Sequence, residues 1–120
     1  MDERIRFIKH QGKQILSLDF SLATAGEMIP LLTQVQTTVG QQAPKSVLVL
    51  ANYQGAEIDD KVAMKIKQVL ALDRPFVKKA AWIGAEHIPH ALMENFHMFS
   101  QRETTTFKTQ EEALEWLVRE

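Results

Sequence analysis

Two histidines and a glutamate in the stretch HALMENFHMF have side chains that could do chemistry. His90, Glu94 and His97 lie at positions i, i+4 and i+7, so a helix would place all three on one side. Imidazole and carboxylate groups can bind a metal ion or transfer protons. However, His90 and His97 are two helical turns apart, about 10 Å along the axis, whereas zinc lies ~2 Å from each ligand. We therefore predict a solvated helix face with no metal and no cofactor; a polar protein interface is the alternative.

The opposite side of the same predicted helix is apolar. Ile88, Leu92, Phe96 and Phe99 fall there, which indicates packing against a core. A homodimer is the alternative, because Phe96 and Phe99 could also pack between two subunits. The spacing does not separate these two alternatives.

A second candidate site follows the apolar run SVLVLA. The next residues are Asn52, Tyr53, Gln54 and Gly55, and Asp59 stands at the predicted start of a helix. Ligands of open α/β sheets bind beyond the carboxyl ends of the strands. The polar side chains offer hydrogen bonds, and Gly55 allows close backbone approach. We predict a binding surface for a protein partner or a small ligand; a plain strand–helix connection is the alternative.

A third candidate is a group of five basic residues: Lys61, Lys65, Lys67, Lys78 and Lys79. The first two share a helix face, whereas the adjacent Lys78 and Lys79 point to opposite faces if their strand is regular. We predict a solvated surface. A patch for an anionic lipid or a nucleotide is the alternative.

No residue is assigned a catalytic role. None of the four serines lies in a GxSxG turn, and the sequence has no cysteine nucleophile. The Gly84-Ala85-Glu86 stretch lacks the further glycines of a dinucleotide fingerprint. We therefore expect a protein that is not an enzyme.

Composition excludes further functions. The 120 residues fit one domain over residues 1–120, and the net charge of −1 does not favour binding to nucleic acid. The absence of cysteine fits a reducing compartment. The N-terminal residues have no apolar run of a secretory signal, and no stretch approaches the ~20 apolar residues of a membrane span. We expect a cytoplasmic protein without a membrane span.

Strands and helices alternate along the chain and would position these candidates. Two short strands are expected within residues 4–20, and further strands at 46–51, 76–84 and 104–107. Helices are expected at 24–39, 59–72, from 89, and from 109. Pro30 would move the first helix start towards Ile29. The order ββαβαβαβα predicts an α/β fold with a mixed, mostly parallel five-stranded sheet, covered by about four helices.

Several stretches resemble a known family. GKQILSLDF, KSVLVLANYQGAEID, RPFVKKAAWIG and FKTQEEALEWLVRE are similar to bacterial STAS/Sec-fourteen-like proteins, small stand-alone relatives of anti-sigma-factor antagonists. The resemblance covers nearly the whole chain and includes an acidic last helix with the pair Trp116-Leu117. It implies a single STAS-like domain that acts as a non-enzymatic signalling or protein-interaction module, or alternatively as a small-molecule or lipid-binding domain.

One feature of that family can be compared residue by residue. Anti-sigma-factor antagonists carry a phosphorylatable serine just after the third strand, at the start of the second helix. The corresponding stretch ANYQGAEIDDK contains no Ser or Thr, and Asp59 stands at the helix cap. The resemblance therefore implies partner contact without a serine phosphoswitch.

Overall fold

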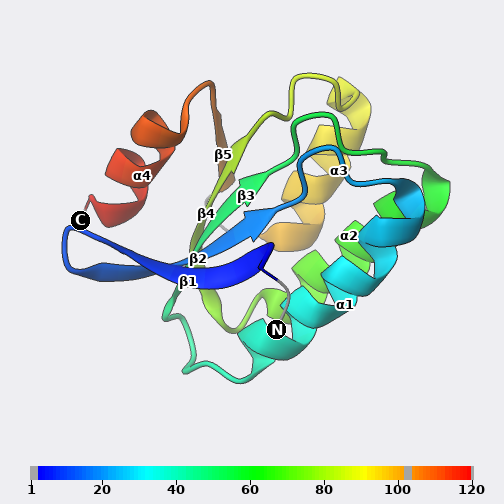
Figure 1. Cartoon of the computed structure of the whole chain (residues 1–120). Helices are drawn as coiled ribbons and strands as arrows, with labels where there is room; N and C mark the ends of the chain where they lie inside the picture. Colours follow the sequence, from blue (N-terminus) through cyan, green and yellow to red (C-terminus); the bar gives the residue numbers. More distant parts are fainter. Residues whose placement is uncertain (1–2, 102–103, 120) are drawn as a thin grey trace.

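A five-stranded sheet forms the centre of the computed structural model, which describes residues 3–101 and 104–119. Its spatial order β1-β2-β3-β4-β5 follows the chain (Figure 1). The strands are β1 (Ile5–His10), β2 (Lys13–Asp19), β3 (Val47–Asn52), β4 (Val77–Ile83) and β5 (Thr104–Phe107). β1 pairs antiparallel with β2, and the other neighbours pair in parallel. The predicted α/β class, element order and mixed sheet are confirmed.

Helices cover both faces of the sheet. They are α1 (Ala25–Gly40), α2 (Asp60–Asp73), α3 (His90–Ser100) and α4 (Gln110–Val118). α1, α2 and α3 lie on one face and α4 lies on the other (Figure 1). Within the described residues, no helix combines the length and apolarity that crossing a membrane requires.

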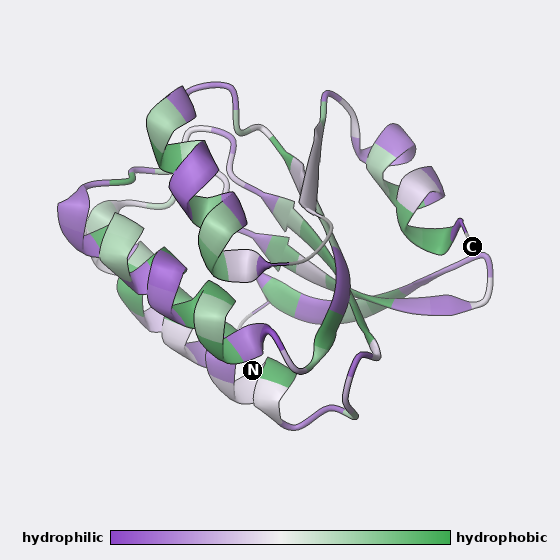
Figure 2. Ribbon diagram, turned by 180° about the vertical axis from the view of Figure 1, so that it is seen from behind, coloured by the Kyte–Doolittle hydropathy of each residue, from purple (hydrophilic) through white to green (hydrophobic). Residues whose placement is uncertain are grey.

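The alternation of side chains along β3 explains why both faces need helices. Val47, Val49 and Ala51 join the larger apolar cluster, under α1 to α3. Leu48 and Leu50 join the smaller cluster, under α4. Successive residues of a strand point to opposite faces, so a run of consecutive apolar residues fits a strand buried on both sides. Figure 2 shows the resulting mixture of hydrophobic and hydrophilic segments along the chain from behind.

The start of α1 differs from the expectation based on Pro30. The helix begins at Ala25, not near Ile29, and Pro30 lies inside it. Thr24 and Glu27 form a capping box, in which each side chain bonds the backbone N–H of the other residue. This box satisfies two N–H groups at the helix start, which favours an early beginning.

The pairing of β3 with β4 contains a bulge. Val47 pairs with Val77, but the next residue, Leu48, pairs with Lys79, so Lys78 is an extra residue without an opposite partner. The extra residue moves Lys79 to the α4 side of the sheet. Opposite faces were predicted for Lys78 and Lys79 only if the strand is regular; the bulge removes that condition, and both residues line the same groove.

Candidate functional site

Three loops meet at the carboxyl edge of the parallel strands. Together we call them the carboxyl-edge surface: residues 20–24 after β2, 53–59 after β3, and 84–89 after β4. Backbone hydrogen bonds join the first two loops, from Leu22 N to the Gln54 carbonyl (2.8 Å) and from Glu57 N to the Ala23 carbonyl (2.9 Å). A ring nitrogen of His87 lies 2.9 Å from the Ala56 carbonyl, which connects the third loop. These bonds fix the loops relative to one another.

The side chain of Tyr53, the first residue of the loop after β3, points into the core and not towards solvent. Its side chain is 3% exposed, and its ring lies between those of Phe20 (5.1 Å between centroids) and Trp82 (4.6 Å). Phe96 extends the row beyond Trp82, at 5.7 Å. The sequence placed Tyr53 among the exposed contact residues, but in this structure its ring cannot meet a macromolecular partner. It supports the loop from below.

The other predicted residues of the loop have distinct positions. Asn52 accepts a hydrogen bond from Gln54 N through its side-chain oxygen, at 3.0 Å. Asp59 accepts one from Val62 N at 2.8 Å and so caps α2. The carboxylate of Asp59 thus already occupies the start of this helix, where an anionic ligand would otherwise bind. Gln54 and Gly55 are exposed to solvent.

Close backbone contact explains the glycine at position 55. It has φ +69°, and an added Cβ would lie 2.6 Å from Cδ2 of Leu22. Leu22 therefore rests directly on the Gly55 backbone. A larger residue at position 55 would push Leu22 away from the loop after β3.

Leu22 is a surface residue that the sequence analysis missed. It is 77% exposed, more than any other large hydrophobic side chain in the described residues, and has φ +58°. The left-handed conformation costs an L-residue other than glycine about 1–2 kcal/mol. The only sequence sign was an apolar residue in the turn between Ser21 and Ala23. Leu22 therefore adds little to the core, and its backbone conformation costs stability.

Replacing Leu22 with asparagine is expected to raise the free energy of unfolding by about 0.5–1 kcal/mol, because asparagine tolerates a left-handed backbone better. Urea denaturation followed by circular dichroism measures this. The control is Met64→Asn, which changes a 71% exposed residue within α2 and should lower stability slightly. A loss of stability in Leu22→Asn would show that the side chain packs more than its exposure indicates.

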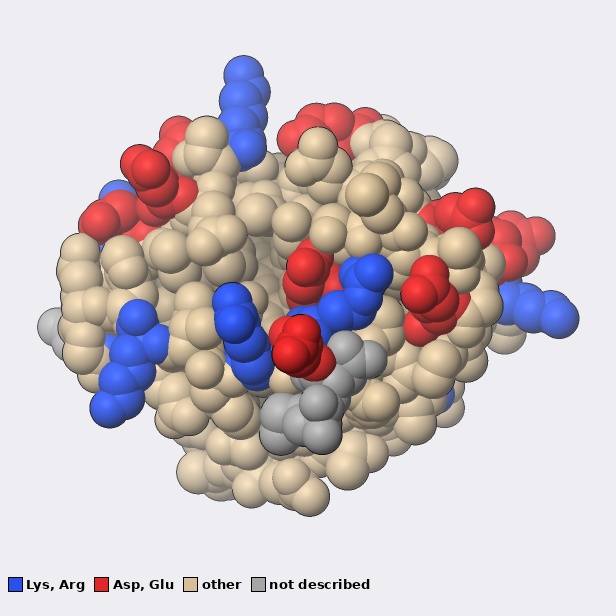
Figure 3. Space-filling model, viewed as in Figure 1, with Lys and Arg blue, Asp and Glu red and all other residues tan. Residues whose placement is uncertain are grey.

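Acidic side chains surround the carboxyl-edge surface. In Figure 3 red side chains lie at the top and on the right, over the loops that follow β4 and β3, and a separate red group lies at the upper left, over α4. Exposed acids at these loops and the adjoining helix starts are Asp19, Glu27, Glu57, Asp59, Asp60 and Glu86. The surface is therefore complementary to a basic partner rather than to a phosphate.

The predicted polar face of α3 is exposed. The side chains of His90 and Glu94 are 89% and 67% exposed, and they lie 3.1 Å apart (Nε2 to Oε1). His97 is also exposed, and with His87 and His90 it lines a groove of about 780 Å³ between α3 and β5. In the part of the chain that the structure describes, no three His, Asp or Glu side chains are arranged to hold a metal ion.

The apolar side of α3 divides between core and surface. Phe96 is 2% exposed and packs on Trp82. Phe99 is 39% exposed, Lys67 lies over its ring at 5.9 Å, and Arg74 donates to its carbonyl at 2.6 Å. Phe96 therefore belongs to the intramolecular core, and Phe99 is the residue of this pair that a second subunit could contact.

Ser21 and Asp19 pair a hydroxyl with a carboxylate, but their contact forms a turn. Ser21 donates through both its N–H (3.0 Å) and its hydroxyl (2.6 Å) to Oδ1 of Asp19. A side-chain carboxylate that accepts from the residue two positions later closes a local turn. The pair accounts for the sharp exit of the chain from β2.

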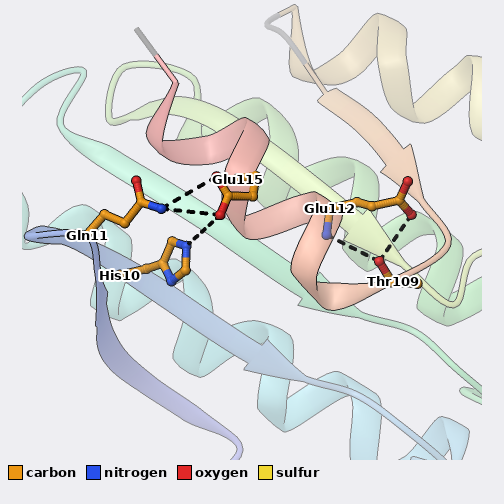
Figure 4. Close-up of polar contacts among 5 residues, drawn as sticks. All are labelled: His10, Gln11, Thr109, Glu112 and Glu115. Carbon is orange, nitrogen blue, oxygen red and sulfur yellow. Dashed lines mark hydrogen bonds and ion pairs between the residues drawn. The ribbon is translucent and has the colours of Figure 1, made fainter.

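α4 is held to the sheet by contacts beyond its apolar side. Glu115 accepts a hydrogen bond from Gln11 (3.2 Å) and lies 3.7 Å from Nε2 of His10, at the tip of the β1–β2 hairpin (Figure 4). Thr109 caps the helix through Glu112 N, at 3.2 Å. These contacts fix α4 across the sheet from α1 to α3.

The interior offers little room for a ligand. A cavity of about 30 Å³ lies between the sheet and the helices α1 and α2, lined by apolar residues together with Tyr53 and Asp73. This is the volume of about one water molecule. A lipid chain would require a different conformation.

The fold is that of the STAS-like, or SpoIIAA-like, α/β domains. One similar structure is an uncharacterised protein of the DUF3478 family with a SpoIIAA-like fold from Shewanella loihica PV-4. Its TM-score is 0.69 at 14% identity, over 94% of this chain and 91% of that one. A second is an anti-sigma-factor antagonist (STAS) domain protein from Planctomyces limnophilus, with a TM-score of 0.62 at 13% identity, over 96% and 98%. No family model and no curated protein matches the sequence.

Proposed function

We propose that this protein is a non-enzymatic, cytoplasmic signalling module that binds a protein partner through the carboxyl-edge surface. The observation that carries the proposal is the exposed Leu22. Its backbone conformation is strained, and it lies on loops that are joined by backbone hydrogen bonds. Covering this exposed apolar side chain with a partner would remove its surface from water, which favours association. Because the loops are already fixed, binding would require little ordering of the backbone.

The fold is consistent with this proposal. One of the similar structures is named as an anti-sigma-factor antagonist domain protein, a name that describes a protein acting on another protein. The acidic surround of Leu22 favours a partner with a basic surface. A small-molecule or lipid-binding function is the weaker candidate, because the enclosed cavity has a volume of about 30 Å³.

Adding positive charge to the surface tests the proposal without disturbing the core. Gln54 and Asp60 are exposed, so Gln54→Lys with Asp60→Lys leaves the buried residues and the Asp59 cap in place. Immobilised wild-type and variant protein would be incubated with extract of the source cells, and bound proteins quantified by mass spectrometry. We expect recovery of at least one protein to fall about tenfold or more, which corresponds to 1.4 kcal/mol.

The matched control is Gln34→Lys with Glu94→Lys, which introduces the same charge change on exposed positions of α1 and α3. Recovery of the same protein should stay within about twofold of wild type. Equal recovery of every partner from the two double variants would remove the carboxyl-edge surface from the function.

A further inference from the structure

We propose that a groove at the amino end of the sheet binds a small phosphorylated molecule with at least two negative charges. The groove, which we call the amino-edge groove, has a volume of about 290 Å³. It lies between the starts of β2 and β4, the segment before β3 and the end of α4. Its basic residues are Lys13, Lys45, Lys78, Lys79 and Arg119.

The charge of this groove differs from that of the whole chain. Five of its described lining residues are basic and none is acidic, although the protein has a net charge of −1. Cations gathered in a concave surface raise the local concentration of anions. These basic residues lie far apart in the sequence, between positions 13 and 119, and the fold brings them together.

The bulge in β4 brings the two adjacent lysines to the same side. With regular pairing, Lys79 would point into the apolar cluster beneath α1 and α2. The extra residue Lys78 instead lets Lys79 pair with Leu48 and reach the α4 side. Bulges commonly re-aim a side chain near functional sites. The bulge is a feature of the strand pairing and not of the number of charges, and it also supports an anion site in the groove.

Two of the ammonium groups are held in fixed positions. Lys79 Nζ donates to the carbonyls of Trp116 (3.1 Å) and Arg119 (2.8 Å), and lies 4.8 Å from the centre of the Trp116 ring. Lys13 Nζ donates to the Val118 carbonyl, at 3.1 Å. These bonds neutralise the carbonyl end of α4, and also place two cations at the groove wall with reduced side-chain freedom.

Two other lysines of the groove, Lys45 and Lys78, make no hydrogen bond to the described residues at the end of α4. The ammonium groups of Lys45 and Lys78 have no hydrogen-bond or ion-pair partner among the described residues, and both side chains are exposed. Ammonium and guanidinium groups together bind phosphate oxygens by charge-assisted hydrogen bonds. Exposed cations are screened by salt, so a ligand must contact several of them at once. A diphosphate group satisfies this requirement.

Titration calorimetry of the full chain with inorganic pyrophosphate tests the inference at about 0.15 M salt. We expect saturable one-to-one binding with a Kd below about 1 mM. Lys45→Gln with Lys78→Gln should raise Kd at least tenfold. These exposed side chains do not contact the core, so circular dichroism should show an unchanged fold.

The control is Lys61→Gln with Lys65→Gln, which removes the same charge on α2, and it should change Kd by less than about twofold. Adenosine, which lacks phosphate, should not bind. A Kd for pyrophosphate above about 1 mM, or an equal rise of Kd in the two double variants, would overturn the inference. It stands apart from the proposed function, because the groove and the carboxyl-edge surface share no residue.

Discussion

Replacing Trp82 with alanine is expected to lower the free energy of unfolding by about 3–5 kcal/mol. The side chain is 2% exposed, and its ring lies 4.6 Å from that of Tyr53 and 5.7 Å from that of Phe96. The variant would leave a large cavity at the centre of this aromatic row, directly below the loop after β3. Urea denaturation followed by circular dichroism measures the loss.

Trp116→Ala is the matched control for that prediction. Trp116 is only partly buried, and packs between Phe107 (5.5 Å between ring centroids) and Lys79. Its removal should lower the free energy of unfolding by only about 1–2 kcal/mol, because Trp116 buries less apolar surface than Trp82 and solvent can fill the space that it leaves. Equal losses in the two variants would contradict the central role of Trp82 in the core.

Replacing Gly84 with alanine is expected to lower the free energy of unfolding by about 2–5 kcal/mol, the sum of backbone strain and overpacking. Gly84 has φ +68°, and an added Cβ would lie 2.5 Å from N and 2.7 Å from Cα of Gln54. Neither backbone atom can move without breaking the bond from Tyr53 N to the Ile83 carbonyl or shifting the loop. Thermal and urea denaturation measure the effect.

Gly12→Ala separates strain from contact. Gly12 has a similar φ of +79°, but an added Cβ there would meet no atom within 4 Å. Its substitution should cost only the backbone term, about 1–2 kcal/mol. If Gly84→Ala were no more destabilising than Gly12→Ala, the close approach of the loops after β3 and β4 would not be a constraint.

Local patterns in the sequence were enough to predict most of the fold. The apolar run SVLVLA predicted a strand at 46–51, and the structure confirms one at Val47–Asn52, buried on both faces. The helix expected at 24–39 is present and begins at Ala25, after the capping box of Thr24 and Glu27. Pro30 misled, because the cap outweighs one missing hydrogen bond. These features depend on residues close together in the chain.

The candidate site depended on contacts between distant residues and was predicted only in outline. Tyr53 is polar and adjoins a loop, but Phe20, directly after β2, and Trp82 of β4 enclose it. The exposure of Leu22 depends on the loop containing Gly55. The bulge at Lys78 is a property of the pairing with β3, which no pattern within one strand reveals. The sequence therefore identified the loop after β3, but it misplaced the buried Tyr53 and did not single out the exposed Leu22.

The two ends of the sheet have opposite chemical character. The carboxyl edge combines exposed acids with Leu22, whereas the amino edge collects basic residues in one groove. Because the central strands are parallel, their carboxyl ends share one edge and their amino ends share the other. The two surfaces of opposite charge therefore lie at opposite ends of the sheet. A protein partner at one edge and a small anion at the other could then bind without steric conflict.

The most direct test of the interaction surface is the affinity of the purified chain for a partner identified by the capture experiment. Calorimetry would compare wild type, Gln54→Lys with Asp60→Lys, and Gln34→Lys with Glu94→Lys. We expect a Kd raised at least about tenfold in the first double variant, and changed less than about twofold in the second. An unchanged Kd in the first, or an equal rise in both, would contradict the proposal.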